Sequence, residues 1–448
     1  MRSLSGTLLA AQKAMGDALY KITLTKSGED TQTYGCDTTN RIVGSGIRHW
    51  EGDWLQTAEV TIDDRDGNVT SINLVGYQGV ISYGYATGSD EYSATAPLKV
   101  ITQRLDFRPD GICVLSLEGK GNQMTKDKAS SIIKNGIAAS IPTPNLLILD
   151  YTYPFEETDV GKKVYNVTAD TWARVTAKEA DNALSLDSDI FQSGSQSFEI
   201  HSSIAYEPAS DNSDTVKTII NAIAGATMEC FSHCEAITVS WDVEDWLINS
   251  LALADSFKVY RGQTRFEKIR ELLSYTACDS RFEADGKLHL FMTFARAWQA
   301  NFNYYENEVV RPTVPYGAEH GDFIYRCTTE GVSGATEPTW TTLPSDTISD
   351  GSVVWTLEYD YIYDTDSDDH NVYQKSTQRR LVSPNKITVL SHPSQETSYI
   401  GVSTEPISYA DQPQEDFVYL RLTSNTEAED IAKAKIDRLK RDSATGQG

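Results

Sequence analysis

The sequence lacks the long apolar runs of membrane-spanning segments. Across its 448 residues no stretch approaches the roughly 20 consecutive apolar residues that cross a bilayer. The apolar run near the N-terminus stops at Gln12 and Lys13, which is too short for the core of a signal peptide. We therefore expect a protein that is made in the cytosol and does not itself insert into a membrane.

The motifs that identify many enzymes are absent as well. The Gly-Lys pairs at Lys120, Lys162 and Lys287 do not continue as phosphate-binding loops. No His-Glu-x-x-His zinc motif and no Gly-x-Ser-x-Gly nucleophile motif occurs. The absence of these motifs does not exclude an enzyme, but no pattern in the sequence supports one. We expect no catalytic residue, no cofactor and no metal site, and a protein that is not an enzyme.

Basic residues are scarce relative to acidic ones. Lys and Arg number 39 against 64 Asp and Glu, which gives a net charge of −25. Such a chain lacks the cations that displace counterions from phosphates, so it should not coat nucleic acid. An acidic wall could still surround DNA and let it slide. Charge alone favours the simpler interpretation that it keeps the protein soluble.

The cysteines are few and scattered, six in all. Without a signal peptide they are expected to be reduced and mostly buried. The segment "CFSHC" offers Cys230, His233 and Cys234 as zinc-type ligands, but a structural zinc site needs four. We favour buried thiols over a metal site.

Two acidic segments resemble cation loops only in part. In "DTDSDD" (364–369) the expected turn glycine is Asp369 and the expected final glutamate is Lys375, so an acidic linker is preferred. The segment "DDRDGN" (63–68) is predicted to be a hairpin turn.

Alternation and turn residues predict β structure in the first third. Ala58, Val60 and Ile62 share one face of a strand, and a hairpin turns on Asp110-Gly111. Regular short strands suggest a small barrel or sandwich. The composition of the sequence changes near residue 138, where a second β segment begins. Residues 206–213 are predicted to be a linker.

Helical periods appear after residue 213. One stripe begins with Ser213 or Asp214 as the expected cap, and another helix begins near Thr264. The chain ends in a third helix, for which Thr426 and Glu429 form a capping-box pattern. The apolar stripes are Val216, Ile219, Ile220 and Ile223; Phe266, Ile269, Leu272 and Leu273; and Ala428, Ile431, Ala432, Ile436 and Leu439.

The segment "RFEADGKLHL" (281–290) predicts a hairpin that follows the second helix. Asp285-Gly286 forms the turn, and Phe282 with Leu288 or Leu290 should pack inward. His289 is expected to carry no chemistry.

Aromatic residues gather between 297 and 371, in a segment expected to be a compact β module. Tyr325, Trp340 and Trp355 could present rings to a sugar, or they could fill a small core. The core is preferred for most of them, and the three remain the candidate glycan-binding residues. The basic cluster is expected to be a solvated face or an intersubunit contact; it consists of Lys375, Arg379 and Arg380.

Several segments together resemble one family, the central tail-hub proteins of tailed bacteriophages. These are related to baseplate hubs of contractile tails and to the hub part of type VI secretion spikes. The segments, in order, are "SLSGTLLAAQKA", "NLVGYQGVISYGY", "APLKVITQRLDFRPDGICVLSLEGKGNQM", "TIINAIAGATMECFSHC", "FKVYRG", "IRELLSYTACDSRFEADGKLHL", "PNKITV" and "TEAEDIAKAKIDRLKR". Each is weak alone, and their order carries the resemblance.

The resemblance implies a mainly β fold with minor α, of the α+β type. The expected domains are a β-barrel-like hub domain (1–137), a helix–hairpin hub domain (213–296) and a second hub β region with a C-terminal helix (372–448). Two small β modules would be inserted at 138–212 and 297–371. Each inserted module is similar to small modules of phage structural or tail proteins, and the second kind is sometimes suspected of binding surface glycans.

The family also implies a function and partners. We expect a structural protein of the virion tail tip that forms a homotrimer. It would join a ring of distal tail or tube protein to the central fibre or spike, contact the tape-measure protein, and gate a channel through which DNA passes without specific binding. Two alternatives remain, a tail adhesin that binds host-surface glycan and a tail-associated cell-wall hydrolase.

Overall fold

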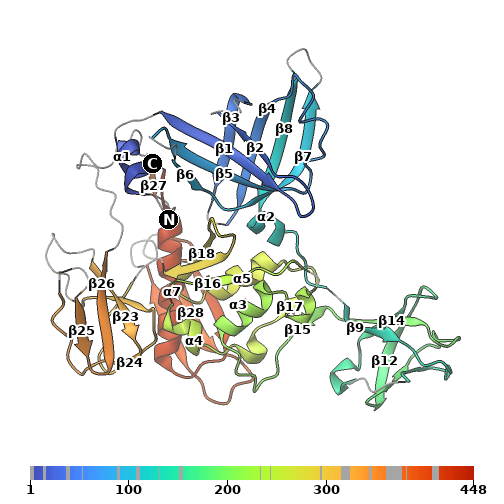
Figure 1. The fold of residues 1–448 in the computed structure, drawn as a ribbon. Helices are drawn as coiled ribbons and strands as arrows, with labels where there is room; N and C mark the ends of the chain where they lie inside the picture. Colours follow the sequence, from blue (N-terminus) through green and yellow to red (C-terminus); the bar gives the residue numbers. More distant parts are fainter. Residues whose placement is uncertain are drawn as a thin grey trace.

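The computed structural model describes most of the chain. The described residues are 5–13, 17–36, 41–52, 54–87, 91–106, 111–130, 132–150, 155–232, 234–242, 244–292, 295–313, 323–341, 343, 346–359, 376–379, 381–405 and 413–447. Strands far outnumber helices in these residues, so the prediction of a mainly β fold with few helices is confirmed. Figure 1 shows several sheets arranged around a helical centre.

The N-terminal part is an eight-stranded antiparallel sheet that follows helix α1 (Gly6–Lys13). Its strand order is β2-β1-β5-β7-β8-β4-β3, with β6 paired to β5. Ala58, Val60 and Ile62 of β4 are buried in one core, as their alternation predicts. The strands are β1 (Ala18–Thr25), β2 (Gln32–Gly35), β3 (Ile42–Glu51), β4 (Gln56–Asp63), β5 (Gln78–Tyr85), β6 (Glu91–Ala94), β7 (Leu98–Asp106) and β8 (Ile112–Gly119).

A six-stranded antiparallel sheet follows, and in Figure 1 it projects to one side of the molecule. Its order is β10-β13-β12-β11-β14-β9, over a separate core that includes Phe155, Val164 and Phe198. The strands are β9 (Ile132–Ile137), β10 (Leu146–Ile148), β11 (Lys163–Asn166), β12 (Thr171–Ala180), β13 (Ala183–Leu186) and β14 (Ser197–His201). Because β9 pairs with β14, residues 132–137 share a sheet with this segment. The division of the chain into five domains stays a prediction.

The helical centre contains α3 (Val216–Ala224), α4 (Trp246–Ser250) and α5 (Arg265–Leu273). Thr215 caps α3 by accepting a hydrogen bond from Thr218 N. The expectation of a Ser213 or Asp214 cap is therefore wrong, because the cap must directly precede the first helical residue for its side chain to reach the third. The predicted apolar stripe of α3 is buried, and so is that of α5 apart from the partly buried Phe266.

The predicted hairpin directly follows α5. It consists of β18 (Cys278–Phe282) and β19 (Leu288–Met292), and β16 (Val239–Trp241) pairs parallel to β19. Phe282, Leu288 and Leu290 are buried, as predicted. Gly286 adopts φ +76°, a conformation that glycine reaches without the steric cost of a Cβ.

The segment after β20 (Arg296–Ala297) is a second small β unit. Its five-stranded sheet has the order β20-β22-β23-β26-β25, and β21 pairs with β24 beside it. The remaining strands are β21 (Asn303–Tyr304), β22 (Val309–Arg311), β23 (Phe323–Thr329), β24 (Gly331–Val332), β25 (Thr347–Asp350) and β26 (Val353–Tyr359).

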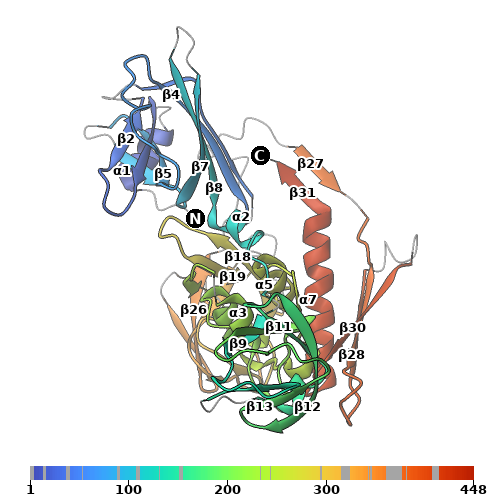
Figure 2. The same cartoon turned by 90° about the vertical axis from the view of Figure 1, so that its right-hand side faces the viewer.

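The C-terminal part packs one long helix against a three-stranded sheet, as Figure 2 shows. The helix is α7 (Asn425–Ser443), and the sheet order is β29-β28-β30, with strands β28 (Lys386–Ser391), β29 (Ile400–Thr404) and β30 (Glu415–Leu420). Gly401 lies against α7 so closely that a Cβ would come 2.1 Å from the backbone of Ala428. A short ribbon of β27 (Ser376–Arg379) and β31 (Ala444–Gln447) completes this part.

The start of α7 differs from the prediction. Ser424 Oγ accepts a hydrogen bond from Glu427 N, and the Glu427 carboxylate accepts one from Thr423 N. The predicted pair Thr426 and Glu429 is wrong because Thr426 already lies inside the helix. No helix among the described residues is long and apolar enough to span a membrane.

Candidate functional site

A cleft of about 580 Å³ lies between the N-terminal sheet and the β18–β19 hairpin. One wall comes from Glu51, Gln56 and the segment 92–96, and the other from 281–285 and His289. The hairpin also contacts the N-terminal part directly, because Lys120 Nζ donates a hydrogen bond to Gly286 O at 3.3 Å. The hairpin turn is therefore a joint between two parts of the chain.

His289 lies at the centre of an ion-pair network in this cleft. Its Nδ1 is 2.8 Å from Asp242 Oδ2, and its Nε2 is 3.0 Å from Asp285 Oδ1. Burial alone would lower the pKa of His289, but the hydrogen bonds to Asp242 and Asp285 outweigh it and raise the pKa. With both ring nitrogens facing carboxylates, the doubly protonated imidazolium is the form that fits, since each nitrogen then donates.

The same contacts lower the pKa values of two acidic groups of the network, Glu283 and Asp285. Burial favours a raised pKa for Glu283 and Asp285, yet the bond from Arg281 to Glu283 and the bonds from Lys287 N and His289 to Asp285 hold both values below the usual range. A general acid needs a raised pKa. Glu283 and Asp285 are therefore deprotonated at neutral pH and do not suit the role of a general acid.

One ligand atom from each of Asp242, Glu283 and His289 lies within 4.8 Å of the others. A cation bound there would have to replace the proton through which His289 bonds Asp242. It would also compete with Arg281 Nε, which donates to Glu283 Oε1 at 2.7 Å. The ion-pair network accounts for these three residues without a metal, and the absence of a metal stays a prediction.

A third part of the chain reaches the same joint. Arg326 Nη1 of β23 donates a hydrogen bond to the backbone oxygen of Asp242 at 2.7 Å. The expectation that His289 takes part in no chemistry stays a prediction, but its structural role is larger than the sequence suggests. The pairing with Asp242 joins positions 47 residues apart, and nothing in the local pattern of either segment indicates it.

The sheet of β28, β29 and β30 has one covered and one bare face. On the side facing α7, Ile387 and Val389 are buried in the central core. The opposite side carries an apolar face, which we define as Ile400, Val402, Phe417 and Tyr419, with exposed fractions of 51%, 45%, 51% and 50%.

The strand register makes the apolar face continuous. Thr388 of β28 is paired with Val402 on one side and Phe417 on the other. One step along, Leu390 is paired with Ile400 and with Tyr419. Clustered exposed apolar side chains of this kind commonly mark an interaction site. The sequence carries a signal for it, because β30 has Phe417 and Tyr419 at one parity and Val418 and Leu420 at the other.

The three predicted aromatic residues lie together in the core of the second small β unit. Tyr325, Trp340 and Trp355 are all buried, and the rings of Tyr325 and Trp340 lie 4.3 Å apart. Trp355 Nε1 donates a hydrogen bond to Asp350 Oδ2 at 3.0 Å. The burial favours the core interpretation, and as they lie here the rings present no face to a sugar. Glycan binding by this segment stays a prediction.

The cysteines form no disulfide in the structure, and four of the six are buried. Burial raises the pKa of the Cys230 thiol to about 12, so the thiol is protonated and unreactive in this structure. Cys234 is partly buried, and burial raises its pKa as well. The remaining candidate His233, the acidic segment 364–369 and the side chains of the basic cluster lie outside the described residues.

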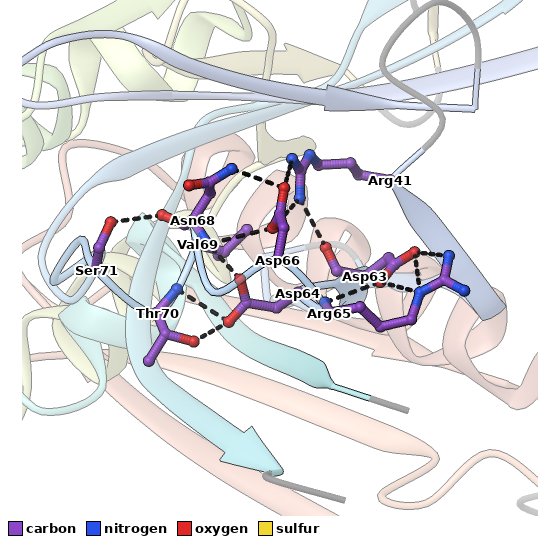
Figure 3. Close-up of polar contacts among 9 residues, drawn as sticks. All are labelled: Arg41, Asp63, Asp64, Arg65, Asp66, Asn68, Val69, Thr70 and Ser71. Carbon is purple, nitrogen blue, oxygen red and sulfur yellow. Dashed lines mark hydrogen bonds and ion pairs between the residues drawn. The ribbon is translucent and has the colours of Figure 1, made fainter. Parts of the chain in front are cut away.

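The acidic segment 63–68 forms a turn whose carboxylates accept hydrogen bonds from neighbouring protein groups, as Figure 3 shows. Asp64 accepts hydrogen bonds from Val69 N and Thr70 N, at 2.7 and 3.0 Å. Asp66 accepts one from Arg41 Nη1 at 2.9 Å. The donors come from the protein itself, so these carboxylates need no cation. The expected hairpin is wrong, because β4 and the next strand, β5, are not neighbours in the sheet.

No family model and no curated protein matches the chain. Among solved structures, a tail protein from Neisseria meningitidis is similar at 8% identity and a TM-score of 0.42, over 96% of this chain and 79% of that one. The 43 kDa tail protein of prophage MuSo2 from Shewanella oneidensis has 10% identity and a TM-score of 0.36, over 95% and 80%. The prophage tail protein gp18 from Listeria monocytogenes has 9% identity and a TM-score of 0.34, over 91% and 76%. Likeness at this level carries no argument about function.

Proposed function

We propose that the chain is a structural hub protein of a bacteriophage tail tip. It forms a trimeric ring that joins the tail tube or distal tail ring to the central fibre or spike, and the ring closes or gates the DNA channel. The order of the hub-like sequence segments supports the family. The structural observation that carries the proposal is the apolar face of β29 and β30, because it gives the chain a surface suited to assembly.

The acidic composition fits the same role. With a net charge of −25, a ring of such subunits repels phosphate, and DNA can pass without being held. The tape-measure protein would leave through the same channel. The ion-pair network at His289 suits a hub as well. A subunit that connects a ring to a fibre has to hold its own domains in fixed positions relative to one another.

A light-scattering measurement on the purified chain tests the assembly. We expect a species of three times the 49.6 kDa chain mass. We expect Phe417→Ser to dissociate it, because the substitution removes one of the two exposed rings of the apolar face. The matched control is Ile141→Ser, at an apolar side chain that is 78% exposed outside this face. A wild-type monomer at micromolar concentration would contradict the proposal, and so would equal dissociation by both variants.

The hydrolase alternative has a separate test. The carboxylates of the cleft are paired and their pKa values are lowered where shifted, which is unlike the raised acid of a glycoside hydrolase. Zymography on peptidoglycan should therefore show no clearing band. A clearing band that disappears in the Glu283→Gln variant would support the hydrolase alternative, with the cleft as the active site.

A further inference from the structure

The projecting six-stranded sheet carries two stacked aromatic rings on its outer side. Tyr165 of β11 and Trp172 of β12 are directly paired, and their rings lie 4.5 Å apart at an interplanar angle of 26°. Trp172 remains 50% exposed. The neighbouring positions of opposite parity, Val164 and Ala173, are buried in the core. The two rings therefore belong to the face that turns away from the core.

Polar side chains flank the rings at the adjacent register positions. Glu199 of β14 is paired with Tyr165, and Lys163 is paired with both Arg174 and His201. The ring centroids of Trp172 and His201 are 5.0 Å apart, and His201 Nε2 lies 3.0 Å from Glu199 Oε2. We call this surface the aromatic face; it consists of Lys163, Tyr165, Trp172, Arg174, Glu199 and His201.

A structural role for the aromatic pair alone does not account for the surface. A cross-strand aromatic pair stabilises a sheet modestly, and this stabilisation does not require any particular residues around the pair. Here a half-exposed indole lies among donors and acceptors of both charge signs. An exposed ring with polar groups around it offers a ligand both an apolar contact and hydrogen-bond partners.

We infer that the aromatic face binds a glycan. One side of a pyranose ring presents C–H groups that can stack on the exposed indole of Trp172. Its hydroxyls both donate and accept hydrogen bonds. The Glu199 carboxylate can accept from them and the Arg174 guanidinium can donate to them. The inference concerns a different surface from the apolar face and does not depend on the tail-hub proposal.

Other occupants fit the aromatic face less well. Single-stranded nucleic acid also stacks on aromatic rings, but it needs a positively charged groove. Here Glu199 lies beside the rings, and Asp170 accepts a hydrogen bond from the Tyr165 hydroxyl at 2.9 Å. The mixture of charges therefore favours a ligand with many hydroxyls over one with a charged backbone.

An array of bacterial-surface oligosaccharides, probed with the full chain, tests the inference. We expect wild-type binding to at least one immobilised glycan and a loss of about tenfold in affinity for Trp172→Ala, which corresponds to the upper range of one aromatic contact. The matched control is Trp50→Ala, at a tryptophan that is 57% exposed on β3 of the N-terminal sheet. This control should bind as the wild type does.

A second pair of variants keeps the test decisive if Trp172→Ala unfolds the segment. Glu199→Gln and Arg174→Gln leave the stacked rings in place, and each should weaken binding while circular dichroism stays unchanged. The inference is overturned if the wild type binds no glycan, if neither polar variant weakens binding, or if Trp50→Ala loses as much affinity as a folded Trp172→Ala. It is also overturned if a single-stranded oligonucleotide binds the face more tightly than every glycan.

Discussion

The two small β segments place their aromatic residues in opposite ways. In the sheet of β20 to β26, the rings of Trp340 and Trp355 fill the core. In the sheet of β9 to β14, Tyr165 and Trp172 lie outside the core, with Trp172 half exposed. Aromatic content alone therefore does not locate a binding surface in a small domain. The parity of a ring relative to its apolar strand neighbours decides whether it is available to a ligand.

The largest expected effect is the loss of stability when a buried tryptophan is removed from the sheet of β20 to β26. Trp355→Ala should lower the free energy of unfolding by about 3–5 kcal/mol, because it empties a fully buried site. Urea denaturation followed by fluorescence measures it. The comparison would be broken if this substitution cost no more than one at Trp172.

Removing the polar partner of the buried rings should cost less. Asp350 Oδ2 accepts hydrogen bonds from both Trp298 Nε1 and Trp355 Nε1, at 2.8 and 3.0 Å. Asp350→Ala removes the acceptor of both indoles and of Gly334 N, which donates to Asp350 Oδ1 at 2.7 Å. Because water entering the vacated space replaces part of these bonds, the net cost should be about 1–3 kcal/mol. Asp350→Asn is the control because it retains an acceptor oxygen. Equal unfolding midpoints for the alanine variant and the wild type would show that the core does not depend on this carboxylate.

The exposed pair should contribute little to folding. Trp172→Ala should destabilise the chain by about 0.5–1.5 kcal/mol, the range of one aromatic pair. The same denaturation experiment checks it. A loss as large as that of Trp355→Ala would make the pair a core feature and remove the contrast between the segments.

The smallest effect concerns the charged joint, which belongs to neither segment. The folded pKa of His289 is raised, so its network stabilises the fold fully below the unfolded value of about 6.5. This contribution is lost as the pH rises through the folded pKa. The difference in unfolding free energy between wild type and His289→Gln should therefore shrink between about pH 5.5 and about pH 8.5, by less than about 1 kcal/mol. A difference that grows with pH would contradict the imidazolium assignment.

Local patterns predicted the elements better than they predicted the surfaces. Local sequence patterns were enough to predict the buried stripes of α3, α5 and α7 and the hairpin at Asp285-Gly286. Short-range periodicity determines which side of such an element is buried. The caps Thr215 and Ser424 were missed because several Ser, Thr and Asp residues precede each helix. Which of these residues is the N-cap depends on the exact residue at which the helix begins.

The sites depended on register, which sequence patterns determine poorly. The aromatic face needs β11, β12 and β14 in their observed pairing, and the apolar face needs β28 between β29 and β30. Parity was nevertheless visible: Tyr165 alternates with Val164, and Trp172 alternates with Ala173. Attention to parity rather than to aromatic content would have favoured 163–174 over Trp340 and Trp355 as a candidate ligand surface.

The central claim is that this chain assembles through its C-terminal sheet into a hub. Native mass spectrometry of the purified full chain, combined with two-dimensional particle averages, tests it most directly. The account predicts three copies of the 49.6 kDa chain arranged around a central hole. A compact monomer with the apolar face of β29 and β30 open to solvent would contradict it.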